Sequence, residues 1–514
     1  MSSKTKAPSL LDALIPIIAL IIMLAGSVIL YGDSSSYGAN QIALLLAAAI
    51  AMLVGHKNGY RWRDIETGIV KGISMALGAI LILLMVGSLI GTWILSGTVP
   101  TMIYYGLKIL DPSIFYAAAC VVCALVSISI GSSWTTAGTV GVALIGIAAG
   151  LELSLPITAG AIISGAYFGD KMSPLSDTTN LAPAVAGTEL FTHIRHMAWT
   201  TGPSILIAII IFTVIGFTGS AEGSSEGLQN TLSIINANFS ISFFTLLPLF
   251  LVLFLAYKKM PAFPTLFIGA LVGGLFAAFF QAPVVEKMSG SSQYYWVNAI
   301  DAVWRAMYGG FTVVTGDKVV DQLLSSGGDG RGGMANMLNT VWLILCAMTF
   351  GAVLETIGLL QRLVTSALKM VKGTGSLIGT VIGTCIGTNI IAADQYIAIV
   401  LPGRMYRAEF KKRKLHPKNL SRVLEDSATI TSPMIPWNTC GAFMAGTLGV
   451  PTLVYLPFCF FNLANPVVSI IYGITHFKIE KIEESGEESI DSDSIDATSS
   501  SKTKEDASED AVLS

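Results

Sequence analysis

The sequence is poor in charge and in the residues that build catalytic and metal sites. Only 12% of its 514 residues are charged, and it contains five histidines and six cysteines. All six cysteines fall within apolar stretches, where cysteine behaves as a small hydrophobic residue. No disulfide framework, metal-ligand cluster or nucleophile beside a base is visible, so we expect neither an enzyme nor a bound metal or cofactor. We expect no nucleic-acid partner either.

Apolar residues are abundant instead. They make up 53% of the chain, more than one soluble core could bury, so the lipid bilayer is the expected surrounding. Stretches close to the roughly 20 residues that cross a bilayer recur throughout. Examples are residues 14–30, 73–95, 205–217, 243–257 and 341–360. The pattern predicts an all-α polytopic membrane protein, with about 10 to 13 transmembrane segments of that length.

Basic residues in the short loops predict the orientation, because cytoplasmic loops retain positive charge. The loop after the second apolar stretch carries Lys57, Arg61 and Arg63, whereas residues 219–240 contain no base. Eight lysines and arginines lie between Arg404 and Arg422. Both termini are therefore expected in the cytoplasm. The tail from residue 478 is rich in serine and acids, a composition typical of disorder.

The two halves of the chain show a weak duplication. The strings at 130–133 and 386–389 are similar, and the distance from Gly131 to Asp170 equals that from Gly387 to Asp426. The loop charges give the two copies opposite directions, which predicts an inverted repeat, a common basis of alternating access. The expected parts are N-terminal helices 1–72, a first repeat 73–218, a connecting and extracytoplasmic part 219–337, a second repeat 338–477, and a tail 478–514.

Polar residues and glycine interrupt the apolar pattern at matching places in both halves. The breaks are 131–138 and 169–180 in the first half, and 387–394 and 425–438 in the second. Such segments are typical of broken helices, whose free carbonyls and hydroxyls line a wet cavity at membrane depth. Carboxylate, hydroxyl, amide and carbonyl oxygens are the ligands that a hard cation such as Na⁺ prefers. The breaks therefore predict an ion or substrate site.

The candidate ligands are the acids, hydroxyls and amides of these breaks. They are Asp170, Asp177, Asp394 and Asp426, with Ser132, Ser133, Thr135, Thr178, Asn180, Thr388, Asn389, Ser427, Thr429 and Asn438. Glu355 is a weaker candidate acid. All five histidines are expected in loops or at helix ends, which disfavours a histidine proton relay. Removal from water favours the protonated form of a carboxyl group, so proton and sodium can compete for one carboxylate.

Each acid also has a purely structural interpretation. Asp177 and Asp426 could cap helices, since an aspartate side chain accepts hydrogen bonds from free backbone N–H groups. Asp170 could pair with its neighbour Lys171 or mark a cytoplasmic turn. Trp134 and Trp437, which lie in the breaks, could pack as well as gate.

The run GDKMSPLSDTTNLA at 169–182 resembles the NhaC family of sodium/proton antiporters. Supporting motifs are Gly91-Thr92-Trp93, Ser96-Gly97-Thr98-Val99-Pro100, Ser133-Trp134-Thr135, Gly387-Thr388-Asn389, Asp394-Gln395, Glu425-Asp426-Ser427 and Pro436-Trp437-Asn438-Thr439. Together they cover about residues 10–475. The resemblance implies two inverted repeats with an ion site between them, and a prokaryotic inner membrane as the location.

The resemblance leaves the substrate open, because members of the family exchange organic anions or amino acids as well as sodium. A carrier of a small carboxylate or amino acid is therefore the alternative, since the amino ends of broken helices could hold a carboxylate. Against an anion, Lys171 is the only base in the breaks. A channel is disfavoured, because alternating access explains the repeat and the buried acids together. A homodimer remains open.

Overall fold

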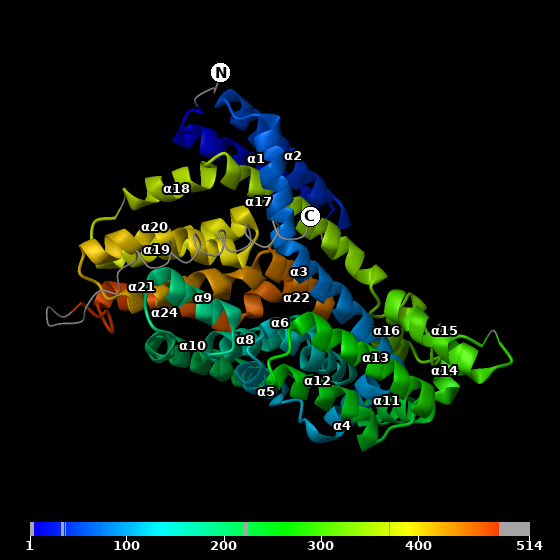
Figure 1. Cartoon of the computed structure of the whole chain (residues 1–514). Coiled ribbons are helices and arrows are strands. Elements are labelled where there is room, and N and C mark those ends of the chain that lie inside the picture. The colour runs from blue at the N-terminus through cyan, green and yellow to red at the C-terminus, as the bar shows by residue number, and fades with distance from the viewer. Residues whose placement is uncertain are drawn as a thin grey trace, which may run out of the picture. The chain divides into compact units, whose positions relative to one another are not determined.

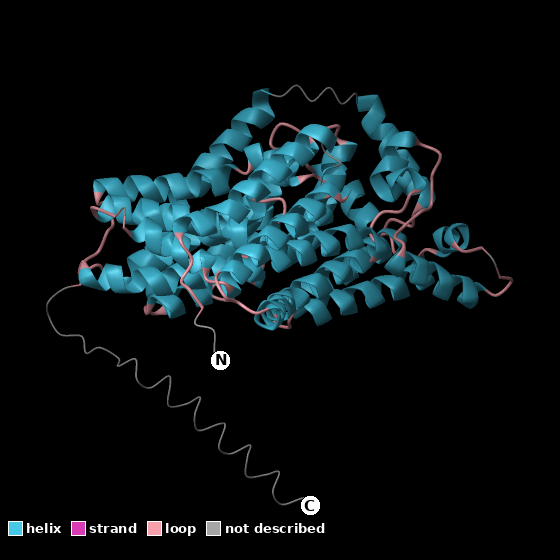
Figure 2. Ribbon diagram, turned by 90° about the horizontal axis from the view of Figure 1, so that it is seen from above, coloured by secondary structure: helices cyan, strands magenta, loops and turns pink. Residues whose placement is uncertain are grey.

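The computed structural model describes residues 5–31, 35, 37–218, 225–290, 292–369 and 371–482, without the side chains of 225–228 and 319. The predicted acidic tail lies outside these ranges beyond residue 482. The chain divides into two units, Met1–Ile479 and Glu480–Ser514, and the description below concerns the first. Its described residues form helices joined by loops, with no strand and one isolated β-bridge between Phe311 and Arg331 (Figure 2).

Eight helical segments in the described ranges are long and apolar enough to cross a membrane, or ten if each of two bent pairs forms one span. They are α1 (Leu10–Tyr31), α2 (Ala39–Lys57), α3 (Trp62–Leu95), the interrupted helix Ser133–Gly150, α10 (Leu190–Thr218), α13 (Ala262–Phe280), Ala335–Thr356, which contains α17 (Leu338–Thr356), and α19 (Thr374–Ala392). The bent pairs are Gln229–Asn238 with Phe243–Tyr257, and Thr439–Leu448 with Thr452–Phe458. The all-α polytopic fold is thus confirmed, with spans at the lower end of the expected number because several apolar stretches break into shorter helices.

The helices of the two halves follow one another in the same order. In each half a long helix ends at a left-handed glycine, Gly97 after α3 and Gly358 after α17, and a short helix follows. These short helices are α4 (Thr98–Ile109) and α18 (Leu359–Leu368). A left-handed backbone costs glycine little, which explains the residue at both turns. The shared order supports a duplication, while its boundaries and inverted orientation stay predictions.

The later breaks also correspond. Helices α9 (Asp177–Ala186) and α22 (Thr439–Leu448) each begin with a capping side chain, Ser176 and Asn438 respectively. Each ends at a left-handed glycine, Gly187 or Gly449. A longer helix comes after each, α10 directly and α24 (Phe460–Thr475) after the short α23 (Thr452–Tyr455) and a 3₁₀ turn. Helix α10 packs against α24, so these two later segments lie side by side.

Helix α8 (Leu155–Met172) carries the start of the break 169–180 to its place in the core. It packs closely along α5 (Phe115–Ile130), and a Cβ on its Gly165 would lie 2.0 Å from the carbonyl oxygen of Cys120. Glycine is therefore required for this approach of the two backbones. The close packing fixes the carboxyl end of α8, where Asp170 and Lys171 lie.

The break 425–438 of the second half also reaches α8. Helix α20 (Gln395–Lys412) packs on α9, α19 and α21 (Pro417–Leu424), and α21 runs directly into η6 (Glu425–Thr429), a π-helical turn (Figure 1). The π turn contacts α8 and α24. Such turns interrupt the regular helical hydrogen bonds and are frequent at functional sites.

The part that connects the two halves is fastened to the carboxyl-terminal third of α3. It contains α11 (Ser225–Asn238), α12 (Leu247–Tyr257), α13, α14 (Ala282–Met288), α15 (Tyr295–Tyr308) and α16 (Lys318–Ser325). The amide of Gly333 donates a hydrogen bond to the carbonyl of Gly87, and a Cβ on Gly91 would lie 2.1 Å from the carbonyl oxygen of Ala306. This contact holds α15 and the following loop against α3.

Candidate functional site

A cavity of about 610 Å³ lies where the breaks of both halves meet α3 and the loop between α12 and α13. Eight of the expected ligands line it, and they come from four different breaks or helix ends. They are Ser132, Ser133, Thr135, Asp170, Asp177, Thr178, Asn180 and Asp394. Thus the first-half candidates converge on one cavity, and the second half contributes one of its two predicted acids.

The three acids of the cavity lie at different depths. Asp177 and its neighbour Asn180 are exposed, whereas Asp170 is 8% and Asp394 6% exposed. All three carboxylates are close enough to Tyr396, which also lines the cavity, to act on it electrostatically. A cation that enters therefore meets an exposed carboxylate first and nearly buried ones further in.

Asp170 faces the start of the helix that begins at Ser133. Its Oδ2 accepts hydrogen bonds from the backbone N–H of Ser133, at 3.2 Å, and from the Ser133 hydroxyl, at 2.6 Å. Ser132 caps the same helix, because its Oγ accepts a hydrogen bond from the amide of Thr135 at 3.2 Å. A helix amino end favours negative charge, so it stabilises the ionised form of Asp170.

Asp394 has a capping role at the start of α20. Its Oδ1 accepts hydrogen bonds from the amides of Tyr396, at 2.9 Å, and Ile397, at 3.0 Å. The residue before it, Ala393, has a left-handed backbone with a φ of 57°. The break therefore turns the chain sharply and places a capped carboxylate at the cavity wall.

Asp177 does not cap α9, contrary to the structural interpretation of the sequence. The cap is Ser176, whose hydroxyl accepts a hydrogen bond from the amide of Thr179 at 3.4 Å. Asn180 donates to the carbonyls of Pro174, at 2.9 Å, and Ser176, at 2.7 Å, and so closes this turn. Asp177 therefore does not cap the helix, and its side chain is exposed at the cavity.

Sequence reasoning missed other lining residues. Gln395, Tyr396 and Thr439 come from the second half, and Lys259 comes from the loop after α12. Lys259 is the one basic residue among those that line the cavity, and it is exposed. No signal in the sequence linked this loop to the breaks, because the contact is made only when the connecting helices fold back on α3.

Asp426, the fourth predicted acid, lies outside the cavity in a buried ionic cluster. We define this cluster as Lys171, Arg422, Glu425 and Asp426, all with fully buried side chains. Lys171 forms an ion pair with Oδ1 of Asp426, which also accepts a hydrogen bond from the Thr200 hydroxyl at 2.9 Å. Arg422 lies 3.8 Å from the other oxygen. Asp170 does not pair with Lys171, and Asp426 caps no helix; both structural interpretations are wrong.

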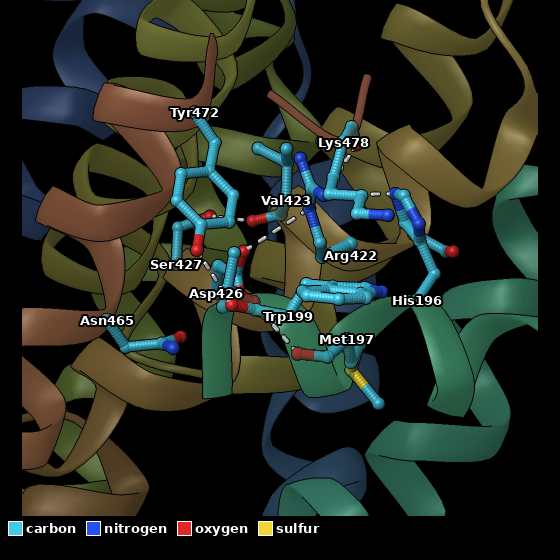
Figure 3. Close-up of polar contacts among 12 residues, drawn as sticks. His196, Met197, Trp199, Arg422, Val423, Asp426, Ser427, Asn465, Tyr472 and Lys478 are labelled. Atoms are coloured by element: carbon cyan, nitrogen blue, oxygen red, sulfur yellow. Dashed lines mark hydrogen bonds and ion pairs between the residues drawn. The ribbon is translucent and has the colours of Figure 1, made fainter. Parts of the chain in front are cut away.

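A wider hydrogen-bonded network surrounds this cluster (Figure 3). Lys171 also donates to Asn465 on α24, at 2.7 Å, and Asn465 donates to Ser204 on α10, at 3.2 Å. Arg422 lies 3.0 Å from Nε2 of His196 and donates to the carbonyl of Lys478 at 3.0 Å. Figure 3 shows Arg422 between His196 and Asp426, with Tyr472 of α24 to one side. The cluster thus joins α8, α10, η6 and α24.

Two histidines near a helix end, as expected from the sequence, are buried. His193 and His196 lie in the first two turns of α10 and are 0% and 4% exposed. His193 shares a hydrogen bond with Ser421 through Nδ1 at 2.8 Å. Because arginine only donates, Nε2 of His196 is the acceptor in its contact with Arg422, so His196 is neutral there. Packing of α10 against α21 buries both rings.

Five other second-half candidates do not line the cavity, and two of them, Asn389 and Asn438, hold the broken helices together. Asn389 donates to the carbonyl of Ala428 at 2.6 Å, and Asn438 donates to the carbonyl of Asn389 at 3.2 Å. Thr388 and Ser427 each donate to a carbonyl one turn earlier, at 2.8 and 2.6 Å. Thr429, in η6, is fully buried and its hydroxyl has no hydrogen-bond partner.

Glu425 and Arg422 were also missed as site residues. Glu425 stands directly before the predicted Asp426, and Arg422 was assigned to a cytoplasmic loop because it follows seven other bases. The two adjacent acids at the start of the break 425–438 were the available signal. What the sequence could not show is that α21 enters the core and carries these charges with it.

Comparison with known proteins shows the family of this chain. Residues 165–477 match the model of the Na+/H+ antiporter family. The Na(+)/H(+) antiporter NhaC of Alkalihalophilus pseudofirmus is 39% identical over 84% of this chain and 89% of its own length. The malate-2H(+)/Na(+)-lactate antiporter of Bacillus subtilis is 37% identical over 85% and 89%. The arginine/ornithine antiporter ArcD of Halobacterium salinarum is 37% identical over 95% and 96%. The matched residues contain three of the four breaks and all four predicted aspartates, and the chain belongs to the Na+/H+ antiporter family that includes the NhaC proteins.

Proposed function

We propose that this protein exchanges Na⁺ for H⁺ across a prokaryotic inner membrane by alternating access. The observation that carries the proposal is the lining of the cavity, where Asp170, Asp177 and Asp394 stand against the single base Lys259. The excess of negative charge favours a cation, and carboxylate and hydroxyl oxygens suit a hard one. The family supports the same function.

Asp170 is the central ligand in this proposal. It is nearly buried, lies on the first-half break and is oriented by two hydrogen bonds from Ser133. A sodium ion can neutralise its carboxylate, and a proton bound at this carboxylate or at another buried acid near it opposes the ion. If the protein reorients only with sodium or a proton bound, sodium movement in one direction returns a proton in the other.

The cavity opens where Asp177, Asn180 and Lys259 are exposed. The Lys258–Lys259 loop is on the cytoplasmic side if both termini are cytoplasmic, as the loop charges predict. On that orientation the structure corresponds to an inward-facing state. Alternating access then requires a second state in which the same acids face the other side of the membrane.

A cationic amino acid is the second candidate substrate. The cavity, at about 610 Å³, has room for more than one dehydrated metal ion, and its acids could hold ammonium or guanidinium groups. The similarity to an arginine/ornithine antiporter supports this candidate. A dicarboxylate such as malate fits less well, because Lys259 is the one base among the lining residues.

The test is transport in liposomes. Purified protein is reconstituted with an acidic lumen and a pH dye, and sodium is added outside; we expect the lumen to become alkaline. Asp170→Asn should abolish the signal, while Asp64→Asn, which neutralises an exposed acid at the start of α3, should retain it. A signal that needs arginine, ornithine, malate or lactate instead of sodium would contradict sodium/proton exchange and identify the substrate.

A further inference from the structure

Glu425 has the most unusual environment of the buried acids. It lies in the π turn η6, its side chain is 0% exposed, and neither carboxylate oxygen has a hydrogen-bond partner. The Thr429 hydroxyl lies one turn further on, close to the Glu425 carboxylate. The geometry between the two groups forms no hydrogen bond, so the hydroxyl also has no partner. By contrast, the neighbouring Asp426 accepts from both Lys171 and Thr200.

Charged groups nevertheless surround Glu425. Lys171 and Asp170, both on α8, and Asp426 on its own element act on its carboxylate electrostatically. Lys171 in turn interacts electrostatically with Glu425 and with Arg422, which lies one turn before Glu425. His193, on α10, also lies within the field of Lys171. Lys171 directs its hydrogen bonds to Asp426 and Asn465, so its charge reaches Glu425 without a hydrogen bond.

An ionised carboxylate without donors is costly to bury, whereas the neutral acid is far less so. The charge count of the cluster makes both forms accessible. With Glu425 ionised, Lys171 and Arg422 balance Asp426 and Glu425; with Glu425 protonated, the cluster carries one excess positive charge. A proton that binds there forms a bond to one carboxylate oxygen and comes from the surrounding water.

Protonation of Glu425 changes the electrostatic potential at Asp170, which lies next to the cluster and lines the cavity. Asp170 directly precedes Lys171 in the chain, so the two side chains leave α8 in different directions, one to the cavity and one to the cluster. An excess positive charge in the cluster opposes a cation at Asp170, and loss of the proton removes that opposition. Cation and proton would then exclude each other without sharing one carboxylate.

We propose that Glu425 is the proton-binding site of the exchange, separate from the cation site at Asp170. The inference rests on the proposed function, because it assigns the proton of that exchange to a second carboxylate. It replaces direct competition at one group by electrostatic coupling across the end of α8.

The first experiment compares wild type with Glu425→Gln in the reconstituted full-length protein. Glutamine has the shape of the acid and cannot release the proton. In wild type the half-saturating sodium concentration should rise at least about fivefold from high to low pH, the lower end of usual coupling between two sites. In Glu425→Gln it should stay at the low-pH value at every pH. Exchange of labelled sodium for sodium should persist at saturating concentration, while proton-coupled exchange is lost.

The matched control is Thr429→Val, which removes the neighbouring hydroxyl and keeps the acid. It should keep a pH-dependent sodium affinity. A wild-type pH dependence in Glu425→Gln would overturn the proposal. Thermal unfolding of each variant in detergent shows whether it is folded. If Glu425→Gln is not folded, Glu425→Ala, which also cannot bind a proton, takes its place. A wild-type pH dependence in Glu425→Ala would likewise overturn the proposal.

A second measurement does not depend on the transported ion. Infrared difference spectra between acidic and alkaline pH should show the carbonyl band of a buried protonated carboxyl group in wild type and Thr429→Val, and lack it in Glu425→Gln. If sodium drives no exchange but this band is present and lost in the variant, the proposed substrate fails while Glu425 remains a proton site. A band that survives Glu425→Gln unchanged would refute the proton site even if sodium/proton exchange is observed.

Discussion

Two neighbouring residues at the end of α8 belong to very different surroundings. Asp170 faces a cavity, is 8% exposed and is oriented by the start of the helix at Ser133. Lys171 is fully buried and is enclosed by charged and polar groups from four other helical elements. The first environment leaves room for a mobile ion, and the second satisfies a fixed charge with protein groups.

The difference shows how one acidic motif can serve two purposes. The two nearly buried carboxylates of the cavity, Asp170 and Asp394, are held by backbone amides at helix starts, which orient them without neutralising them. Asp426 is held by a lysine and a hydroxyl, and so its charge is compensated by the protein itself. The cavity acids should therefore control transport, and the ionic cluster should control stability as well as the coupling described above.

The largest effect on stability is expected from Lys171→Met. Breaking a buried ion pair by removing one partner costs about 3 to 5 kcal/mol, because the other charge stays buried without compensation. Arg422 remains near Asp426, so we expect about 3 kcal/mol, the lower end of that range. Thermal unfolding in detergent measures the loss.

The double variant Lys171→Met/Asp426→Asn sharpens this prediction. It removes both charges of the pair and keeps an oxygen at position 426 for the Thr200 hydroxyl. It should be more stable than Lys171→Met alone, and a double-mutant cycle gives the coupling. If the losses of unfolding free energy in Lys171→Met and Asp426→Asn simply add in the double variant, the two charges do not stabilise each other. The comparison between the two environments would then be wrong.

Thr200→Val should have the next largest effect. Valine is nearly the same size as threonine but cannot donate the 2.9 Å hydrogen bond to Asp426. Loss of a hydrogen bond to a charged group costs about 1.5 to 3 kcal/mol. The same substitution at Thr213, an α10 residue whose hydroxyl bonds only the carbonyl of Ile209, is a matched control. Equal losses of unfolding free energy at the two positions would mean that the ionic cluster adds nothing at Thr200.

Asp177→Asn tests the cavity side and should act on transport. Asp177 is exposed at the cavity and caps no helix, so its removal should leave stability unchanged. The loss of one exposed charge is worth up to about 1 kcal/mol, which is about a fivefold rise in the half-saturating sodium concentration. The maximal rate should change little. Since salt screens exposed charges, the rise should shrink when an impermeant salt raises the ionic strength. An effect that is independent of ionic strength would place Asp177 among the direct ligands.

The breaks could be predicted from the sequence because glycine, proline and hydroxyl residues interrupt long apolar runs, and all-helical membrane architecture follows from those runs. The place of each acid could not. Successive residues of a helix point in directions about 100° apart, so Asp170 and Lys171 diverge, and only the neighbours of α8 decide which one meets the cavity. Arg422 and the two buried histidines show the same limit, since their burial comes from the packing of α21 on α10.

Glu409→Gln should give the smallest effect and completes the series. Glu409 forms an i,i+4 ion pair with Arg413 at 2.7 Å, and both side chains are about a quarter exposed. Exposed pairs of this kind contribute about 0.3 to 0.5 kcal/mol, because water and salt screen the charges. The free energy of unfolding and the sodium/proton exchange rate should thus both stay close to wild type. Glu409 lies on α20, the helix that Asp394 caps, so a clear loss of transport would show that charge at the far end of this helix reaches the cavity. Stability and transport close to wild type would mean that the functional charges are those of the cavity and the ionic cluster.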